Sequence, residues 1–453
     1  MSNAGNQTPA QAGKEQRVAI VGGGLAGSLL ALALAQRGYA VDVYERRADP
    51  RASGAAGRSI NLGMSKRGIT GLQLVGLLDE ILSRSVVMAG RVIHGIDSST
   101  QYQPYGKNET EVLHSIDRVL LIHVLLNRAE QHPGVKLHFE HRLVGCDKQK
   151  RELTLETADG ASHTVSPAFV VGADGAFSTM RQLLQRGERA DYHQEYLEWG
   201  YKELVLAAKP DGSSVIEQKV LHVWPRNHGL IVTHPNQNGS HTLSLFLPHE
   251  GEDSFGSVKT PEQIKALFGR FFPDLMPLMP DLVEQWQTHP ASDLITTRTN
   301  PWCFGDWAVL VGDAVHAVYP LMGQGMNAAF EDCCVLVASL EQYKGDTAGA
   351  FRHYQDSRRQ HTDALAELSV PHFVELRKKV QSPWFQARKK LDLMLNRLMP
   401  TLWIPLYTMI SHTTIPYREA QEKAQRQDAI LRNVALAVGF GIILLLGRMI
   451  FAA

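Results

Sequence analysis

The sequence predicts an α/β fold with a Rossmann-like nucleotide-binding domain. Residues 18–21 (VAIV) have a short buried-strand pattern that runs directly into the glycine-rich turn 22–27 (GGGLAG) and then into a helical stretch. Two later apolar strands end in acidic turns, at 170–175 (VVGADG) and 308–313 (AVLVGD). The composition, with 44% hydrophobic and 20% charged residues, is that of an ordinary globular protein.

The glycine-rich turn predicts a dinucleotide site. Gly22, Gly24 and Gly27 form a GxGxxG motif between strand and helix, and Glu45 ends the next strand about twenty residues later. The glycines permit a tight turn and let backbone amides approach a pyrophosphate at the helix N-terminus. Glu45 would accept hydrogen bonds from a ribose. A glycine-rich turn with a purely structural role is the alternative.

The later stretches favour FAD over NAD. They are 174–181 (DGAFSTMR), 312–316 (GDAVH) and 323–327 (GQGMN), the last of which opens a helix. A carboxylate at the edge of a sheet can bind a ribityl hydroxyl. Amides at a helix N-terminus can stabilise negative charge on a reduced isoalloxazine.

Charge and cysteine content exclude other classes. Lys and Arg number 46, as do Asp and Glu, so the chain lacks the basic excess typical of nucleic-acid binders. Four cysteines are too few and too badly spaced for a disulfide framework or a zinc site. We therefore expect no metal and no nucleic-acid partner, and the cysteines fit a reducing compartment.

The two ends differ from the body. Residues 1–16 are polar and are expected to form a disordered tail. Residues 434–446 (VALAVGFGIILLL) are uncharged and apolar, and 434–453 would span about 30 Å as a helix, the thickness of a bilayer core. We therefore expect a C-terminal transmembrane helix that anchors a cytoplasmic catalytic body to a lipid bilayer. A buried helix that closes the domain is the alternative.

The motifs GxGxxG, DGxxSxxR and GD, in this order, resemble those of the single-component FAD-dependent aromatic hydroxylases. Further stretches resemble the kynurenine 3-monooxygenase family, whose eukaryotic members also carry a C-terminal anchor. These stretches are 57–62 (GRSINL), 103–106 (QPYG), 200–204 (GYKEL), 222–227 (HVWPRN) and 404–409 (IPLYTM). The resemblance covers about residues 17–453.

The resemblance implies a fold in which the FAD-binding domain is interleaved with a mixed β-sheet substrate domain. The FAD-binding domain would comprise 17–95, 110–190 and 295–345, the substrate domain 96–109 and 196–292, the C-terminal helical region 346–432, and the membrane anchor 433–453. The alternating stretch 241–247 (HTLSLFL) suits such a sheet.

The resemblance also implies a reaction. NADPH would reduce non-covalently held FAD, and O2 would add to it as a flavin hydroperoxide that hydroxylates L-kynurenine to 3-hydroxykynurenine in tryptophan degradation. The flavin performs this chemistry, so no catalytic side chain is expected. One alternative is a related hydroxylase of another aromatic amino acid or amine. Another is a membrane-tethered flavin-binding module without hydroxylase activity.

The resemblance assigns the cofactor contacts residue by residue. Beside Gly22, Gly24 and Gly27 of the turn, the family's FAD contacts fall on Ala26, Tyr44, Glu45, Arg46, Arg47, Gly63, Arg118, Leu143, Asp174, Asp313, Met326 and Asn327.

The same resemblance assigns the substrate contacts. Arg91, Tyr105 and Tyr407 match the family residues that bind the amino acid carboxylate, for which a planar guanidinium is suited. His372 stands where the family has asparagine, and a neutral histidine could still donate one hydrogen bond. The chain also differs from the family pattern at His234, Tyr319 and Leu321, so the expected ring end of the site is altered.

Overall fold

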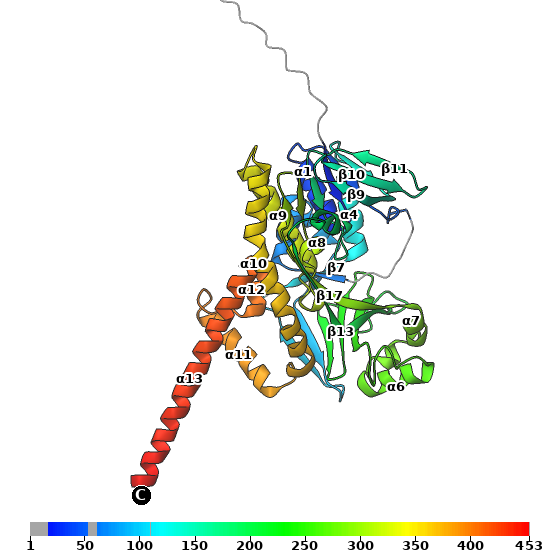
Figure 1. Ribbon diagram of the computed structural model, residues 1–453. Coiled ribbons are helices and arrows are strands. Elements are labelled where there is room, and N and C mark those ends of the chain that lie inside the picture. The colour runs from blue at the N-terminus through cyan, green and yellow to red at the C-terminus, as the bar shows by residue number, and fades with distance from the viewer. Residues whose placement is uncertain (1–16, 53–60, 109, 453) are drawn as a thin grey trace, which may run out of the picture.

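The computed structural model describes residues 17–52, 61–108 and 110–452, with side chains described as far as residue 443. Two β-sheet layers lie one above the other, and the C-terminal helices run along one side of both (Figure 1). The tail expected at 1–16 lies outside the described residues.

The first layer is a six-stranded sheet in the order β18-β19-β12-β1-β2-β8. Its strands are β1 (Val18–Val21), β2 (Val41–Tyr44), β8 (Val135–His138), β12 (Val170–Gly172), β18 (Cys303–Phe304) and β19 (Ala308–Leu310). All pairs are parallel except β18 with β19. Every residue of β1 is buried, as expected for a parallel strand covered on both faces.

Helices and a small sheet surround this layer. α1 (Leu25–Ala35) packs against α4 (Arg118–Glu130) and α9 (Gly325–Gln342), and α5 (Thr179–Gln185) follows β12. The side chain of Asp117 caps α4 by accepting a hydrogen bond of 2.8 Å from the Leu120 amide. β9 (His141–Asp147), β10 (Glu152–Thr157) and β11 (Ser162–Val165) form an antiparallel sheet beside it.

The second layer is a seven-stranded mixed sheet in the order β17-β13-β16-β15-β14-β5-β6. Its strands are β5 (Gly90–His94), β6 (Thr100–Pro104), β13 (Asp191–Leu206), β14 (Leu221–Arg226), β15 (Gly229–Pro235), β16 (His241–Pro248) and β17 (Ala291–Asn300). β5 and β14 are parallel, whereas the other neighbours are antiparallel.

The two faces of this sheet have different partners. Ile231, Leu243 and Leu245 lie in a buried cluster with α6 (Pro261–Phe271), η1 (Met276–Leu278) and α7 (Leu282–Thr288). The alternate residues Leu230 and Val232 face the other way, toward a cavity between the layers. This alternation follows from the period of two along a strand.

A third element joins the two layers. The short sheet β3-β7-β4 comprises β3 (Asn61–Met64), β4 (Val86–Met88) and β7 (Leu113–Asp117), and α2 (Lys66–Leu74) and α3 (Leu78–Ser83) accompany it. Asn61 donates hydrogen bonds to the Pro235 carbonyl at 3.2 Å and to Asn236 Oδ1 at 2.6 Å. β3 is therefore tied to the end of β15.

From Asp313 to the end of the described residues the chain is helical. It contains α8 (Asp313–His316), η2 (Pro320–Met322), α9, α10 (Thr347–Val374), the π-helical turn η3 (Glu375–Lys379), α11 (Pro383–Leu398), α12 (Leu406–His412) and α13 (Tyr417–Ala452). α10 contacts α9, η2 and α13, so one long helix spans both layers. Pro371 lies inside α10 just before the π turn, where a missing backbone N–H disturbs the helix.

A network of buried charges connects these helices to the first layer. Asp332 on α9 accepts from the Gly312 amide at 3.0 Å, from His316 Nε2 at 2.5 Å and from Arg358 Nε at 2.7 Å. Arg358 also pairs with Glu331 at 2.6 Å. Burial would raise the pKa of Asp332, but the charges of His316 and Arg358 outweigh burial and hold it below its usual value.

The network continues to the junction between α12 and α13. Glu331 pairs with Arg67 of α2 at 3.0 Å, and Arg67 donates to the carbonyls of Ile410, Thr413 and Ile415. The Arg67 guanidinium also lies 4.0 Å from the centre of the Tyr417 ring. One buried arginine therefore holds the end of α12 and the start of α13.

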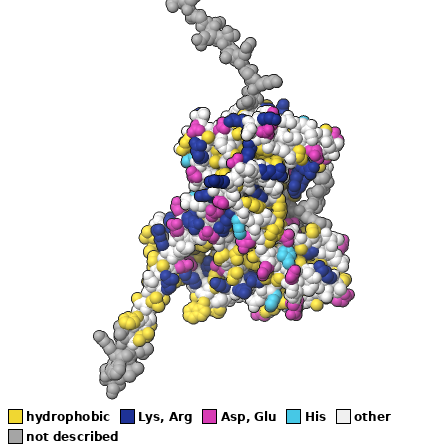
Figure 2. All heavy atoms as spheres, in the orientation of Figure 1, with side chains coloured by type: hydrophobic (Ala, Val, Ile, Leu, Met, Phe, Trp, Pro, Cys, Tyr) yellow, Lys and Arg dark blue, Asp and Glu magenta, His cyan; other side chains and the backbone are white. Residues whose placement is uncertain are grey.

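The expected transmembrane helix is contradicted. Within the described ranges, no helix combines the length and the apolarity that crossing a bilayer requires. The uncharged run at 434–446 has thirteen residues, short of the roughly 20 that a span needs, and Arg448 follows closely. α13 extends away from the body of the protein (Figures 1 and 2), and side chains such as Leu436 and Phe440 are 66% and 64% exposed.

Replacement of Asp332 should test the network. Asp332→Ala leaves Glu331 as the one carboxylate among the described residues that balances the buried guanidinium groups of both Arg358 and Arg67, so we expect a loss of about 3–5 kcal/mol in the free energy of unfolding. Because the folded pKa of Asp332 lies below its unfolded value, this contribution exists above about pH 4 and disappears as the pH falls. Chemical denaturation at several pH values measures both effects.

The exposed Asp356 on α10 provides the control, since Asp356→Ala removes the same charge without breaking a buried pair. Equal unfolding curves for Asp332→Ala and Asp356→Ala at pH 7 would contradict the assigned role of the network.

Candidate active site

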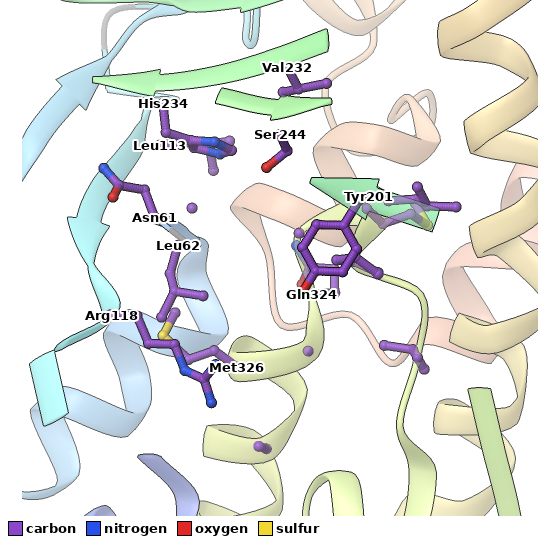
Figure 3. Close-up of a pocket in the computed structure, with 18 of the residues that line it drawn as sticks. Asn61, Leu62, Leu113, Arg118, Tyr201, Val232, His234, Ser244, Gln324 and Met326 are labelled. Carbon is purple, nitrogen blue, oxygen red and sulfur yellow. The ribbon is translucent and has the colours of Figure 1, made fainter. Parts of the chain in front are cut away.

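A cavity of about 340 Å³ lies between the two sheet layers. It is lined by the β1–α1 turn, by β3, by the inward face of the seven-stranded sheet, and by the segments before α9 and in α10 and α12. Figure 3 shows the part where Asn61, His234 and Arg118 lie on one side and Tyr201 and Gln324 on the other. Segments that are distant in sequence therefore form one chamber.

The β1–α1 turn forms one end of the chamber. A Cβ on Gly27 would lie 1.9 Å from the Gly22 carbonyl oxygen, so only glycine allows the turn to close this tightly. At Gly24, by contrast, a Cβ would meet no atom within 4 Å and would project into open space. Glu45 accepts from the Gly23 amide at 2.9 Å, and Ala26 also lines the cavity.

Asp174, which follows β12, and Asp313, which follows β19, have different surroundings. Asp174 accepts hydrogen bonds from the Ser178 hydroxyl and from the Met180 amide at 3.0 Å, so its carboxylate is engaged by α5. Asp313 lines the cavity, and its side chain makes no hydrogen bond to any other described residue. Burial raises the pKa of both carboxyl groups, although His316 and Arg118 favour the charged form of Asp313.

The N-terminus of α9 opens onto the same chamber. Gly323, Gln324, Gly325 and Met326 line it, and no side chain caps the helix. Asn327 points elsewhere: it donates to the Gly63 carbonyl at 2.9 Å and accepts from the Ser65 amide at 2.9 Å. Asn327 therefore fixes β3 against α9, while Gly63 lines the cavity.

Of the remaining predicted cofactor residues, one lines the chamber and the others lie outside it. Arg118 at the start of α4 lines it. Tyr44 is buried and stacks on His138 with ring centres 4.8 Å apart, and Leu143 is buried in β9. Arg46 and Arg47 are exposed just beyond Glu45.

Four predicted substrate residues meet at another part of the wall. All four line the cavity, although Arg91 lies in β5, Tyr105 directly follows β6, His372 lies in α10 and Tyr407 lies in α12. The rings of Tyr105 and Tyr407 stack with centres 5.5 Å apart, and His372 stacks on Tyr407 at 6.1 Å. A second cavity of about 140 Å³, between β6, α11 and α12, shares these four residues.

This group combines one permanent cation with neutral donors. Arg91 Nε donates to Gln103 at 3.0 Å, which orients the guanidinium. Burial raises the pKa of Tyr105 well above its ordinary value and raises that of Tyr407, while burial and the charge of Arg91 lower the pKa of His372 to about 3. Both hydroxyls therefore stay protonated, and they can join a guanidinium in binding a carboxylate.

Apolar residues and three polar ones continue the wall. The apolar residues include Leu221, Leu230, Val232, Phe246 and Leu321, and the polar ones from the seven-stranded sheet are Tyr201, His234 and Ser244. The sequence placed His234 and Leu321 at the ring end of the site but did not assign the other apolar residues, although the period of two along β15 would have placed 230, 232 and 234 on one face. Tyr319 does not line the cavity: it is buried in an apolar cluster and its hydroxyl donates to the Glu195 carbonyl at 3.4 Å.

These features fit a flavin dinucleotide. The turn leaves open space at Gly24, the helix N-termini of α1 and α9 present uncapped amides, and Asp313 offers a carboxylate that lines the cavity and has no hydrogen-bond partner in the described chain. Uncapped amides at a helix N-terminus bind phosphate and other anions. A carboxylate without a partner is suited to accept hydrogen bonds from hydroxyl groups.

Comparison with known proteins identifies the family. The family model described as "FAD binding domain" matches residues 15–369. Kynurenine 3-monooxygenase of Salinispora arenicola is 48% identical over 433 residues, covering 94% of this chain and 95% of that protein. The enzyme of the same name from Flavobacterium psychrophilum is 39% identical over 422 residues, covering 93% and 94%. The chain belongs to the kynurenine 3-monooxygenase family.

Solved structures share the fold. 2-Methyl-3-hydroxypyridine-5-carboxylic acid oxygenase has a TM-score of 0.67 at 23% identity and covers 83% of this chain and 96% of its own. Pseudomonas aeruginosa PqsL has a TM-score of 0.66 at 20% identity, with coverages of 83% and 99%.

Together with family membership, this makes the protein an FAD-dependent aromatic monooxygenase, and NADPH is the typical co-substrate of the family. The alternative of a flavin-binding module without hydroxylase activity is therefore not supported.

Substitution of Gly24 tests whether the β1–α1 turn binds FAD. Gly24→Val places a branched side chain in the open space at the N-terminus of α1, so we expect FAD affinity to fall more than about tenfold while the fold is retained. Flavin absorbance per protein after gel filtration, with circular dichroism for the fold, measures the effect. Gly269→Ala in α6 is the control, because a Cβ there meets only the Met276 sulfur at 3.8 Å. Full flavin content in Gly24→Val would contradict the assignment.

Proposed function

We propose that the protein hydroxylates L-kynurenine at the 3-position, using NADPH and O2, and so contributes to tryptophan degradation. The observation that carries the proposal is the placement of Arg91, Tyr105 and Tyr407 in the same cavity as the glycine-rich turn and Asp313. An amino acid bound by its carboxylate at the first group would extend into the chamber that fits the flavin. Relatives named kynurenine 3-monooxygenase, at 37–48% identity, support this choice of substrate.

The substrate would be anchored at its carboxylate. We assign bidentate binding to the Arg91 guanidinium, whose Nε is already held by Gln103. Tyr105 and Tyr407 donate from their hydroxyls to the same carboxylate. His372 is neutral because of its burial, so it can donate one hydrogen bond without opposing Arg91 by charge.

The aromatic ring would lie against the apolar part of the wall. Leu221, Val232 and Phe246 bury the ring, and the C-terminal helices cover the cavity through His372 and Tyr407. Exclusion of water matters because the activated oxygen must reach the ring before it is lost as peroxide. Bound FAD supplies that oxygen chemistry with electrons from NADPH.

We propose cofactor roles for the remaining residues. Gly22, Gly24, Ala26 and Gly27 would bring the α1 amides to the pyrophosphate, and Glu45 would bind the adenosine ribose. Asp313 would accept from the ribityl chain, and Arg118, Gly63 and Met326 would line the flavin. Tyr44, Arg46, Arg47 and Leu143 would border the adenine end, whereas Asp174 and Asn327 hold the surrounding turns.

We also propose the division into an FAD-binding domain (17–95, 110–190 and 295–345), a substrate domain (96–109 and 196–292) and a helical region (346–432). All strands of the six-stranded sheet fall in the FAD-binding segments, and β6, β14, β15 and β16 of the seven-stranded sheet fall in the substrate domain, whereas β5 and most of β17 extend that sheet with residues from the FAD-binding segments. All four cysteines are free thiols, as is usual in a reducing compartment, so we place the catalytic body in the cytoplasm.

Product identification tests the proposed function. With FAD bound, the protein should convert L-kynurenine to a product heavier by one oxygen atom, and chromatography against a standard should show substitution at the 3-position. L-Tryptophan and L-phenylalanine, which have the same amino acid end, serve as comparison substrates. Turnover of another aromatic compound with L-kynurenine inert would contradict the assignment.

Substitution of Arg91 tests the carboxylate anchor. Arg91→Ala should weaken L-kynurenine binding by about 2–5 kcal/mol, which is at least about a thirtyfold rise in Kd, while FAD stays bound. Arg91→Lys should restore part of the affinity, because lysine has the charge without the planar fork. Binding is measured by the change in flavin absorbance during titration. Arg84→Ala, which removes an exposed arginine paired with Glu80, is the control; equal Kd values in Arg84→Ala and Arg91→Ala would remove the anchor role.

A further inference from the structure

The cavity wall contains a polar side chain that the proposed chemistry does not use. His234 lies near the end of β15, and Figure 3 shows its imidazole projecting into the cavity beside Asn61 and opposite Ser244. Val232 and Leu230, the preceding residues on the same face, are apolar. His234 therefore adds a polar imidazole to a face of β15 that is otherwise apolar at the cavity.

The strand register relates His234 to the carboxylate anchor. Leu221 pairs with Arg91, and the pairing of His222 with Thr233 places Leu221 opposite His234. Arg91, Leu221 and His234 therefore form one row across three neighbouring strands, on the face that lines the cavity. Two strand spacings separate the backbones of Arg91 and His234 by about 10 Å. Side chains that extend from both ends of this row can contact the two ends of one amino acid with an aromatic side chain.

The imidazole of His234 has no partner in the described chain. Neither ring nitrogen makes a hydrogen bond to any residue that the structure describes, and Nε2 lies 4.0 Å from the position that a Cβ on Gly63 would occupy. The side chain of the nearby Asn61 is already hydrogen-bonded to Ser115, Pro235, Asn236 and Thr242, so it does not bind His234. The His234 side chain is half-buried and lines the cavity, so its ring nitrogens are free to hydrogen-bond with a ligand there.

The protonation state of the His234 imidazole follows from its environment. Burial lowers the pKa of His234 to about 4, so the imidazole is neutral near pH 7. A neutral imidazole offers one N–H donor and one acceptor nitrogen. It can therefore accept a hydrogen bond from an aromatic amine, which a leucine or valine at this position could not do.

We propose that His234 is a specificity-determining residue whose imidazole accepts a hydrogen bond from the ring amine of the substrate. This inference rests on the proposed function, in which Arg91 holds the carboxylate at the other end of the row. The two polar contacts together would select amino acids that carry an amine on the aromatic ring, at a fixed distance from the carboxylate. The apolar residues between them contribute affinity without distinguishing such substrates from others.

A pair of ligands tests the role of His234. Kd is measured by flavin absorbance titration without NADPH, for L-kynurenine and for the same amino acid without its ring amine. In the wild-type protein L-kynurenine should bind more tightly, and in His234→Leu the ratio of the two Kd values should fall about five- to tenfold, in line with one hydrogen bond. His234→Asn, which retains an acceptor oxygen, should keep part of the preference.

Val232→Ala is the matched control, because it changes the volume of the same wall without removing a polar group and should shift both Kd values alike. Flavin content and melting temperature establish that each variant is folded, and should His234→Leu lose its flavin, His234→Asn and a His234→Gln variant provide the comparison. An unchanged ratio in folded His234 variants, with normal wild-type turnover of L-kynurenine, would overturn this inference alone. Failure of the wild type to bind L-kynurenine would overturn the proposed function and this inference with it.

Discussion

The buried ion network around Asp332 is the interaction on which the rest of the site depends. Asp332 accepts a hydrogen bond from the Gly312 amide just beyond the end of β19, directly before Asp313 in the cavity wall. The charge of Asp332 is balanced by Arg358. Through Glu331 the same network reaches Arg67, which binds carbonyls at the end of α12. The turn at Gly312 and helix α12, which carries Tyr407, are therefore held in place by one network of charges. Because the charges are buried, removal of any one of them leaves another uncompensated.

This arrangement explains why one cavity can serve two ligands. The first sheet layer contributes helix N-termini and a carboxylate, which suit phosphates and hydroxyl groups. The second contributes a mostly apolar wall with a guanidinium at one point and a neutral imidazole two strands away. Helices that follow the last strand in the sequence cover the gap between the layers. Polar contacts at the ends fix orientation, and the apolar centre keeps water from the reacting ring.

Local signals in the sequence predicted the parts of the site that depend on local geometry. The turn at 22–27 could be identified because its glycines lie between a strand and a helix, and Asp313 because it ends an apolar strand. Arg91 and Tyr407 came only from family resemblance, since no local pattern distinguishes them from surface or core residues. The orientation of Tyr319 away from the cavity and the role of Arg67 depend on tertiary packing. The transmembrane helix was predicted wrongly because apolarity alone was given too much weight against the short uncharged run.

The central claim is that this cavity holds an aromatic amino acid beside the flavin and transfers oxygen to it in preference to releasing peroxide. The most direct measurement is the ratio of hydroxylated product formed to NADPH oxidised and O2 consumed, with L-kynurenine in excess and peroxide assayed in the same sample. We expect a ratio near one and little peroxide. NADPH oxidation that yields peroxide in place of hydroxylated product, with L-kynurenine and with every other aromatic amino acid, would contradict it.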